Sequence, residues 1–122
     1  MKFLLVVAVT LALAIPAAAQ RAPLSHPIDP DLEREAAHNL EVGRHYFKKK
    51  AWAGAKGRLE EIVASYEEFT KIDEVYYLLG LCYYEMDDVD LARETFQKLV
   101  DDRPESPFAK KAKDELARLQ KP

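Results

Sequence analysis

The stretch Tyr76–Phe96, YYLLGLCYYEMDDVDLARETF, decides the fold. Its first half is apolar on nearly every side, which is typical of a helix buried between neighbours. Its second half is acidic and amphipathic, with the small residue Ala92 among larger ones. Between the halves, Asp87 or Asp88 can cap the start of a second helix, because a short carboxylate accepts hydrogen bonds from unpaired backbone N–H groups. The stretch therefore predicts two helices joined by a short turn.

The same pattern occurs earlier in the chain. When Gly43 is aligned with Gly80, small, aromatic and apolar residues recur at offsets of 3, 12, 16 and 19, and the period is 37 residues. The first copy contains Gly43, Tyr46, Ala55, Leu59 and Ile62, and the second contains Gly80, Tyr83, Ala92, Phe96 and Leu99. A period of this size indicates helix hairpins that stack on one another.

The small residues of the second copy indicate where its helices approach. Helix axes come closest where the side chains at the contact are small. We therefore expect Gly80 and Ala92 to lie opposite each other, with Tyr83 and Phe96 filling the space beside them. The one cysteine, Cys82, lies in the same apolar stretch and is predicted to be buried, without an internal disulfide.

Apolar residues at spacings of three and four predict helices and no strands, so the fold class is all-α. Three cap signals mark helix starts: Asp29 before Pro30, Thr70 with Asp73 three residues later, and Ser106 before Pro107. The five predicted helices are residues 30–49, 51–65, 71–85, 89–101 and 107–119.

This pattern resembles the tetratricopeptide repeat, a helix pair of roughly 34 residues. The second copy carries the family's residues as Leu79-Gly80, Tyr83, Ala92, Phe96 and Pro104, and the first carries Val42-Gly43, Tyr46, Ala55 and Leu59. The resemblance implies a right-handed superhelical array of two helix hairpins and a C-terminal capping helix. Repeat one is expected at about residues 36–69, repeat two at about 73–106 and the capping helix at about 107–120.

Over about residues 31–119 the chain is also similar to the outer-membrane assembly lipoproteins, the BamD-like family. The similarity lies in VGRHYFKKKAWAGAKGRLEEIVASY (residues 42–66) and DDRPESPFAKKAKDEL (residues 101–116), although the lipid-bearing cysteine of that family is absent. The resemblance implies a non-catalytic protein–protein interaction module of the cell envelope, accessory to outer-membrane protein assembly. The alternative is a soluble periplasmic scaffold that binds a peptide or partner helix in another envelope process, such as division.

In the tetratricopeptide family, one face of each first helix lines a groove that holds a peptide or partner helix. The resemblance implies that this groove is lined by Leu40, Arg44, Phe47, Tyr77, Leu81 and Tyr84. Tyrosine suits such a surface because it combines apolar area with a polar tip. The alternative is that the last helix packs over these residues and makes them part of the core.

The N-terminus has the features of a secretory signal peptide. Lys2 precedes an apolar run from Phe3 to Ile15, and Ala17 and Ala19 form a small-residue cleavage site. The alternative, a retained anchor, is disfavoured because the run is shorter than the roughly 20 residues that span a bilayer. The predicted division is a signal peptide at residues 1–19, a proline-rich linker at 20–29 and the repeat domain at 30–122. We therefore expect an exported, periplasmic mature chain that does not span the membrane and meets the outer membrane through a partner.

Residues that could carry chemistry do not cluster in the sequence. His38 and His45 are seven positions apart, whereas helical metal-ligand pairs usually stand four apart. Gly54 and Gly57 lack the preceding strand that a phosphate-binding loop requires. The formal net charge is −3, with 18 basic and 21 acidic residues, which does not favour nucleic-acid binding. We predict no enzyme activity, cofactor, metal site or small-molecule substrate, and a protein or peptide as the partner.

Overall fold

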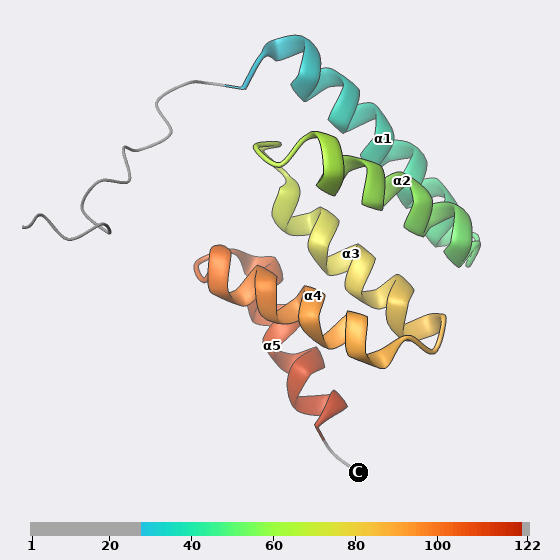
Figure 1. Ribbon diagram of the computed structural model, residues 1–122, viewed down its shortest axis with the longest axis vertical. Coiled ribbons are helices and arrows are strands. Elements are labelled where there is room, and N and C mark those ends of the chain that lie inside the picture. Colours follow the sequence, from blue (N-terminus) through green and yellow to red (C-terminus); the bar gives the residue numbers. More distant parts are fainter. Residues whose placement is uncertain (1–27, 121–122) are drawn as a thin grey trace, which may run out of the picture.

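Five helices make up the part of the chain that the computed structural model describes, residues 28–120 (Figure 1). They are α1 (Pro30–Lys48), α2 (Trp52–Ser65), α3 (Ile72–Glu85), α4 (Val89–Asp102) and α5 (Pro107–Leu119). The predicted all-α class is confirmed, and each helix begins and ends within about one residue of its predicted position. The predicted signal peptide and nearly all of the linker lie outside the described residues.

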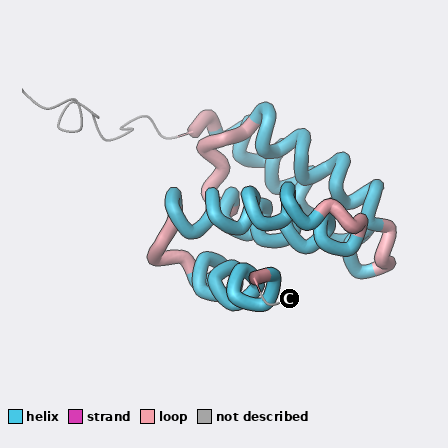
Figure 2. Tube along the Cα trace, turned by 60° about the horizontal axis from the view of Figure 1, so that its bottom comes forward, coloured by secondary structure: helices cyan, strands magenta, loops and turns pink. Residues whose placement is uncertain are grey.

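The helices form a stack of antiparallel pairs, with each helix packed on the next along the chain (Figures 1 and 2). In addition, α3 contacts both α1 and α5, whereas α2 and α4 do not contact each other. The odd-numbered helices therefore form the inner row of a curved stack, and the even-numbered helices form its outer row. No helix within residues 28–120 combines the length and the apolar character that crossing a membrane requires.

Three of the predicted helix caps are present. The side chain of Asp29 accepts a hydrogen bond from the N–H of Asp31 at 2.9 Å, and Asp88 accepts one from Leu91 at 3.3 Å. Ser106 accepts one from the N–H of Phe108 at 3.1 Å. These bonds pair N–H groups that have no partner inside their own helix.

The predicted cap at Thr70 is wrong. Helix α3 begins at Ile72, after Lys71, and has no side-chain cap. The Thr70 hydroxyl instead donates to Glu33 of α1. The Asp73 carboxylate accepts a 2.9 Å bond from the N–H of Glu74. Contacts with α1 thus replace the local capping box.

One continuous core runs through the stack. It includes Ala36, Leu40, Ala55, Leu59, Ile62, Phe69, Ile72, Val75, Tyr76, Leu79, Cys82, Ala92, Phe96, Leu99, Ala109, Ala112 and Leu116. Phe69 lies in the connection between α2 and α3, yet only 1% of its surface is exposed. The two hairpins are therefore joined by a buried aromatic ring as well as by helix faces.

Each hairpin contains one close contact between a glycine and the residue sixteen positions later. A Cβ atom placed on Gly80 would lie 2.5 Å from Cε1 of Phe96, and one placed on Gly43 would lie 3.2 Å from Cδ2 of Leu59. The ring of Phe96 fills the space that Gly80 leaves, as expected, while the direct approach of Gly80 to Ala92 stays a prediction. Ala92 is fully buried in the core.

The two hairpin turns also have equivalent backbones. Lys50 and Asp87, 37 positions apart, have φ values of 57° and 61°. The N–H groups of Ala51 and Asp88 donate to the carbonyls of Tyr46 and Tyr83, both at 2.9 Å. This is the Schellman arrangement, in which a left-handed residue ends a helix.

Cys82 is expected to resist thiol reagents while the chain is folded. The side chain is 0% exposed, and burial raises the pKa of the thiol to about 12. At pH 8 little reactive thiolate is present in the folded chain, so labelling by a chromogenic disulfide should require opening of the structure and scale with the population of the open state. In denaturant, where the thiol is exposed, the same reagent should react as fast as it does with a free thiol. Rapid labelling of the folded chain would contradict this burial.

The thiol pKa is higher in the folded chain than the roughly 8.5 of an exposed thiol. The thiol of the folded state therefore stays protonated to a higher pH than that of the unfolded state. This contribution to stability is complete below pH 8.5 and is lost as the pH rises towards the folded pKa of about 12. The labelling rate should therefore increase with pH more steeply than the thiolate fraction of the unfolded chain does.

Candidate functional site

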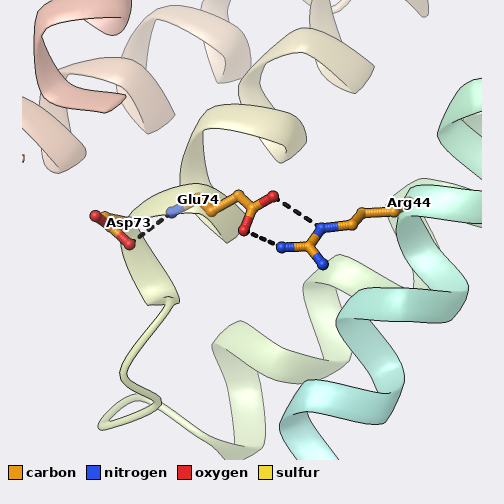
Figure 3. Close-up of polar contacts among 3 residues, drawn as sticks. All are labelled: Arg44, Asp73 and Glu74. Carbon is orange, nitrogen blue, oxygen red and sulfur yellow. Dashed lines mark hydrogen bonds and ion pairs between the residues drawn. The ribbon is translucent and has the colours of Figure 1, made fainter. Parts of the chain in front are cut away.

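An ion pair joins the first two helices of the inner row. Nε of Arg44 on α1 donates to a carboxylate oxygen of Glu74 on α3 at 2.8 Å, and a second guanidinium nitrogen bonds the other oxygen (Figure 3). The two side chains are 38% and 16% exposed. The hydrogen bond to Glu74 is the main cause that raises the pKa of Arg44 above its ordinary value. The charged guanidinium is therefore held against the carboxylate at the start of α3.

A second polar link joins α3 to α5. The hydroxyl of Ser106 donates to Asp73 at 2.6 Å while also accepting the N–H of Phe108. Asp73 is the neighbour of Glu74, and Figure 3 shows the two carboxylates at the start of α3. Helices α1, α3 and α5 are therefore tied together near one end of α3.

Helix α5 covers part of the inner face of α3. The ring of Phe108 lies 5.8 Å from the ring of Tyr77, and Nζ of Lys111 lies 5.8 Å above Tyr77. Further along, Cζ of Arg118 lies 5.1 Å above the ring of Tyr84. Cations at these distances are attracted to the electron-rich faces of the rings. The alternative that the last helix packs over the predicted groove therefore holds along α3, whereas α5 does not contact α1.

The six predicted groove residues occupy different environments. Leu40 is 1% exposed and belongs to the core, so it offers no surface to a partner. Arg44, Phe47, Tyr77, Leu81 and Tyr84 are half-buried. Phe47 packs edge-on against Trp52, with the ring centroids 5.1 Å apart. The structure thus brings these five residues onto the inner row and moves Leu40 beneath it.

The residues that define the repeat are mostly structural. Gly43, Ala55, Leu59, Gly80, Ala92 and Phe96 are buried, Tyr83 is half-buried, and Tyr46 and Pro104 are exposed. The Tyr83 hydroxyl donates to Glu60 of α2 at 2.8 Å, and burial together with this bond raises the pKa of Tyr83. This bond connects the second hairpin to the first.

Sequence reasoning missed Glu74, Lys111 and Arg118 as members of the inner row. The spacing of Glu74 and Tyr77 on one helix, three residues apart, places them on neighbouring positions of one face and could have identified Glu74. Lys111 and Arg118 stand seven apart on α5 and likewise share a face. The inner row therefore presents apolar and aromatic area beside fixed charges of both signs.

Two open hollows are lined by residues other than the predicted groove residues. One, of about 510 Å3, is lined by Arg34, Glu35, His38, Asn39, Glu61 and Tyr66. The other, of about 480 Å3, is lined by Arg93, Glu94, Gln97, Lys98, Asp101, Asp102, Leu116 and Gln120. Within residues 28–120, no three histidine, cysteine or acidic side chains are grouped so that they could hold a metal ion.

The Arg44 ion pair gives a stability prediction. Replacing Arg44 with alanine is expected to lower the free energy of unfolding by about 1 kcal/mol, because the carboxylate of Glu74 loses both of its hydrogen bonds. Lysine at position 44 should recover only part of this loss, since its ammonium group cannot form the two parallel bonds that the guanidinium makes to the carboxylate of Glu74. Urea denaturation of Arg44→Ala, of Glu74→Ala and of the variant that carries both changes measures the coupling between the two side chains. Strictly additive losses would show that the pair contributes nothing.

Comparison with known proteins identifies the second hairpin. The family model described as "Tetratricopeptide repeat" matches residues 74–106. The chain is 33% identical over 73 residues to the outer membrane protein assembly factor BamD of Neisseria meningitidis serogroup B (strain ATCC BAA-335 / MC58), which is 60% of this chain and 27% of that protein. It is 31% identical over 74 residues to BamD of Haemophilus influenzae (strain ATCC 51907 / DSM 11121 / KW20 / Rd), 61% of this chain and 28% of that protein.

The chain therefore spans about a quarter of the length of the curated relatives that it matches. The matched region contains α3 and α4, and the first hairpin repeats their glycine contact and their turn. The second hairpin therefore matches the tetratricopeptide repeat, and the chain is similar to part of BamD.

Proposed function

We propose that this chain is a non-catalytic adaptor of the cell envelope that binds a protein segment and serves outer-membrane protein assembly. The observation that carries the proposal is the combination of a tetratricopeptide repeat with similarity to BamD over about 60% of the chain. Helix-repeat stacks use their curved inner surfaces to hold extended or helical segments of other proteins. The proposal takes the chain to be exported and the segment to be supplied by an envelope protein.

The binding face in this proposal consists of four half-buried residues of the inner row, Arg44, Phe47, Leu81 and Tyr84, the last of which also contacts Arg118 of α5. Aromatic side chains and arginine are enriched at the parts of interfaces that contribute most to binding energy. The Arg44–Glu74 pair supports the proposal because it holds a guanidinium in one place without an entropy loss on binding. Tyr77, which lies beneath α5, positions Phe108 rather than a partner.

A photo-crosslinking residue at position 81 tests both parts of the proposal in envelope preparations. We expect a discrete crosslinked partner from outer-membrane protein assembly, and we expect Tyr84→Ala and Arg44→Ala to reduce its yield. Arg93→Ala is the control, because Arg93 lies on α4, outside the inner row, in a local ion pair with Asp90 at 3.2 Å. A crosslinked partner from another envelope process would contradict the role in outer-membrane protein assembly. It would support the alternative, a scaffold that serves that other process. A second chain with the crosslinking residue on α4 serves as a comparison. The binding face would be refuted if position 81 gave no crosslink while the position on α4 gave a strong one.

A further inference from the structure

The turns that close the two hairpins carry opposite charge. The basic turn, Lys48–Lys50, joins α1 to α2, and the acidic turn, residues 87–90, contains Asp87, Asp88 and Asp90 between α3 and α4. Both turns lie at the same end of the stack, next to each other, in the two views of Figures 1 and 2. All six charged side chains are exposed. One end of the molecule therefore has a positive half and a negative half.

Exposed apolar side chains gather at the same end. Five large apolar residues are exposed within residues 28–120: Leu32 at 43%, Tyr46 at 36%, Met86 at 39%, Val89 at 36% and Leu91 at 40%. Tyr46 lies two positions before the basic turn. Met86, Val89 and Leu91 lie within or next to the acidic turn, and only Leu32 lies far from both turns in the sequence. Apolar area that is gathered in one place and bordered by charge marks an interaction surface. Scattered single residues would need no such explanation.

The backbone of the two turns gives an independent observation. Lys50 and Asp87 hold the left-handed position that glycine usually fills after a helix. A side chain at this position costs free energy that glycine would not, for lysine in particular. Residues kept in costly conformations often serve a function that their side chains provide. Here the equivalent position carries a cation in one turn and an anion in the other.

The charges of the basic turn are not used inside the molecule. No ion pair joins Lys48, Lys49 or Lys50 to another residue within the described part of the chain. In the acidic turn, Asp90 pairs locally with Arg93 and Asp88 caps α4, while Asp87 has neither role. The cations and at least one anion are therefore available to a partner.

We propose that this end of the stack is a self-association surface that takes a second copy of the chain. A twofold axis between the turns places the basic turn of each copy against the acidic turn of the other. A patch with two halves of opposite charge is complementary to itself under this rotation, which is the requirement of a twofold interface. The apolar side chains of Tyr46, Met86, Val89 and Leu91 would then be shielded from water.

Such a dimer joins the ends of the two stacks and leaves both inner rows open. The proposal therefore stands whether or not the inner row binds an envelope protein. The contact is small and polar, so the dimer is expected to be weak and sensitive to salt, with a Kd on the order of 10–100 µM at low ionic strength.

Sedimentation equilibrium of the purified chain tests the proposal with two variants that exchange the residues of the equivalent turns. Lys50→Asp changes the formal charge of the basic turn from +3 to +1, and Asp87→Lys changes that of the acidic turn from −3 to −1. Each variant alone is expected to dimerise on the order of tenfold more weakly than the parent, because each altered turn attracts the oppositely charged turn of the other copy less strongly. An equimolar mixture of the two variants should form a heterodimer more readily than either variant forms a homodimer, since the unaltered basic turn of one copy then faces the unaltered acidic turn of the other. Circular dichroism should show the same helix content for all three chains, with a slightly higher melting temperature for Lys50→Asp and a slightly lower one for Asp87→Lys, because aspartate tolerates the left-handed backbone better than lysine does.

The mixture keeps the test independent of any effect on folding. Weakened single variants and a restored mixture would establish the twofold arrangement. A parent chain that stays monomeric at about 1 mM in low salt would overturn the proposal. It would also be overturned by a dimer that both single variants form as well as the parent does, or by a mixture that behaves as the average of its components.

Discussion

Replacing Phe69 with alanine is expected to lower the free energy of unfolding by about 3–5 kcal/mol, the usual cost of removing a buried aromatic ring. Phe69 is 1% exposed although it lies between α2 and α3. Its N–H donates to the carbonyl of Tyr66 and its own carbonyl accepts from the N–H of Ile72, both at 3.0 Å. The ring is therefore fixed by a tight backbone as well as by packing, and the site cannot easily collapse around a cavity.

The loss matters more here than in the middle of a larger domain. In a stack of hairpins, stability comes from each unit and from its contact with the next one. A cavity at Phe69 weakens the junction between the two hairpins, so the urea transition should move to lower concentration and become less cooperative. Far-UV circular dichroism during urea denaturation measures both changes.

A matched control is Leu32→Ala, which removes a large apolar side chain that is 43% exposed on α1. That change should alter the free energy of unfolding by at most about 0.5 kcal/mol. Similar losses at positions 69 and 32 would mean that Phe69 contributes no more than an ordinary surface residue, contrary to its position in the core.

Phe69 also shows which features of the fold the local sequence pattern does not predict. The helices were predictable because apolar spacing and caps such as Asp29 and Ser106 act locally. Phe69 lies in a charged connection, beside Glu67, Glu68 and Thr70. Its burial depends on how two hairpins meet, which no pattern within one helix encodes. A single aromatic residue in a charged connection was the available signal.

The candidate site was predictable to a similar extent. Helical spacing grouped Arg44 and Tyr84 on one face of their helices. The structure places them on α1 and α3, and binding by that face stays a prediction. The partner of Arg44 was not predicted, since Glu74 is thirty positions away and the pair depends on how α1 and α3 cross. Leu40 was assigned to the same face, but spacing does not show which neighbour covers a residue, and the packed core covers this one.

The second large effect is expected for Gly80→Ala, which should lower the free energy of unfolding by about 1–3 kcal/mol. A Cβ atom at this position would lie 2.5 Å from Phe96, which is 1% exposed and cannot turn away. Alanine is favoured over glycine inside a helix by about 1 kcal/mol, which offsets part of the steric cost. The net loss should appear as a lower midpoint in urea with an unchanged slope.

Two other glycines provide the controls. Gly57 lies in α2 with no atom within 4 Å of a Cβ placed on it, so Gly57→Ala should stabilise the chain by about 0.5–1 kcal/mol. Gly43 is intermediate, because a Cβ there would lie 3.2 Å from the flexible end of Leu59, and its replacement should be nearly neutral. If all three alanine variants were stabilised alike, the contact with Phe96 would not limit the approach of α3 and α4.

A second substitution at the contact separates steric overlap from any other effect of alanine. Phe96→Leu gives the second hairpin the residue that Leu59 provides in the first, and alone it should cost about 1–2 kcal/mol through lost packing. In that background Gly80→Ala should cost less than it does in the parent, because a leucine end can shift by a few tenths of an ångström. The double-mutant cycle should therefore give a coupling of at least about 0.5 kcal/mol in the favourable direction. Equal costs in both backgrounds would mean that the ring is not what excludes a side chain at position 80. A favourable coupling would show that the glycine and the aromatic ring of the second hairpin depend on each other.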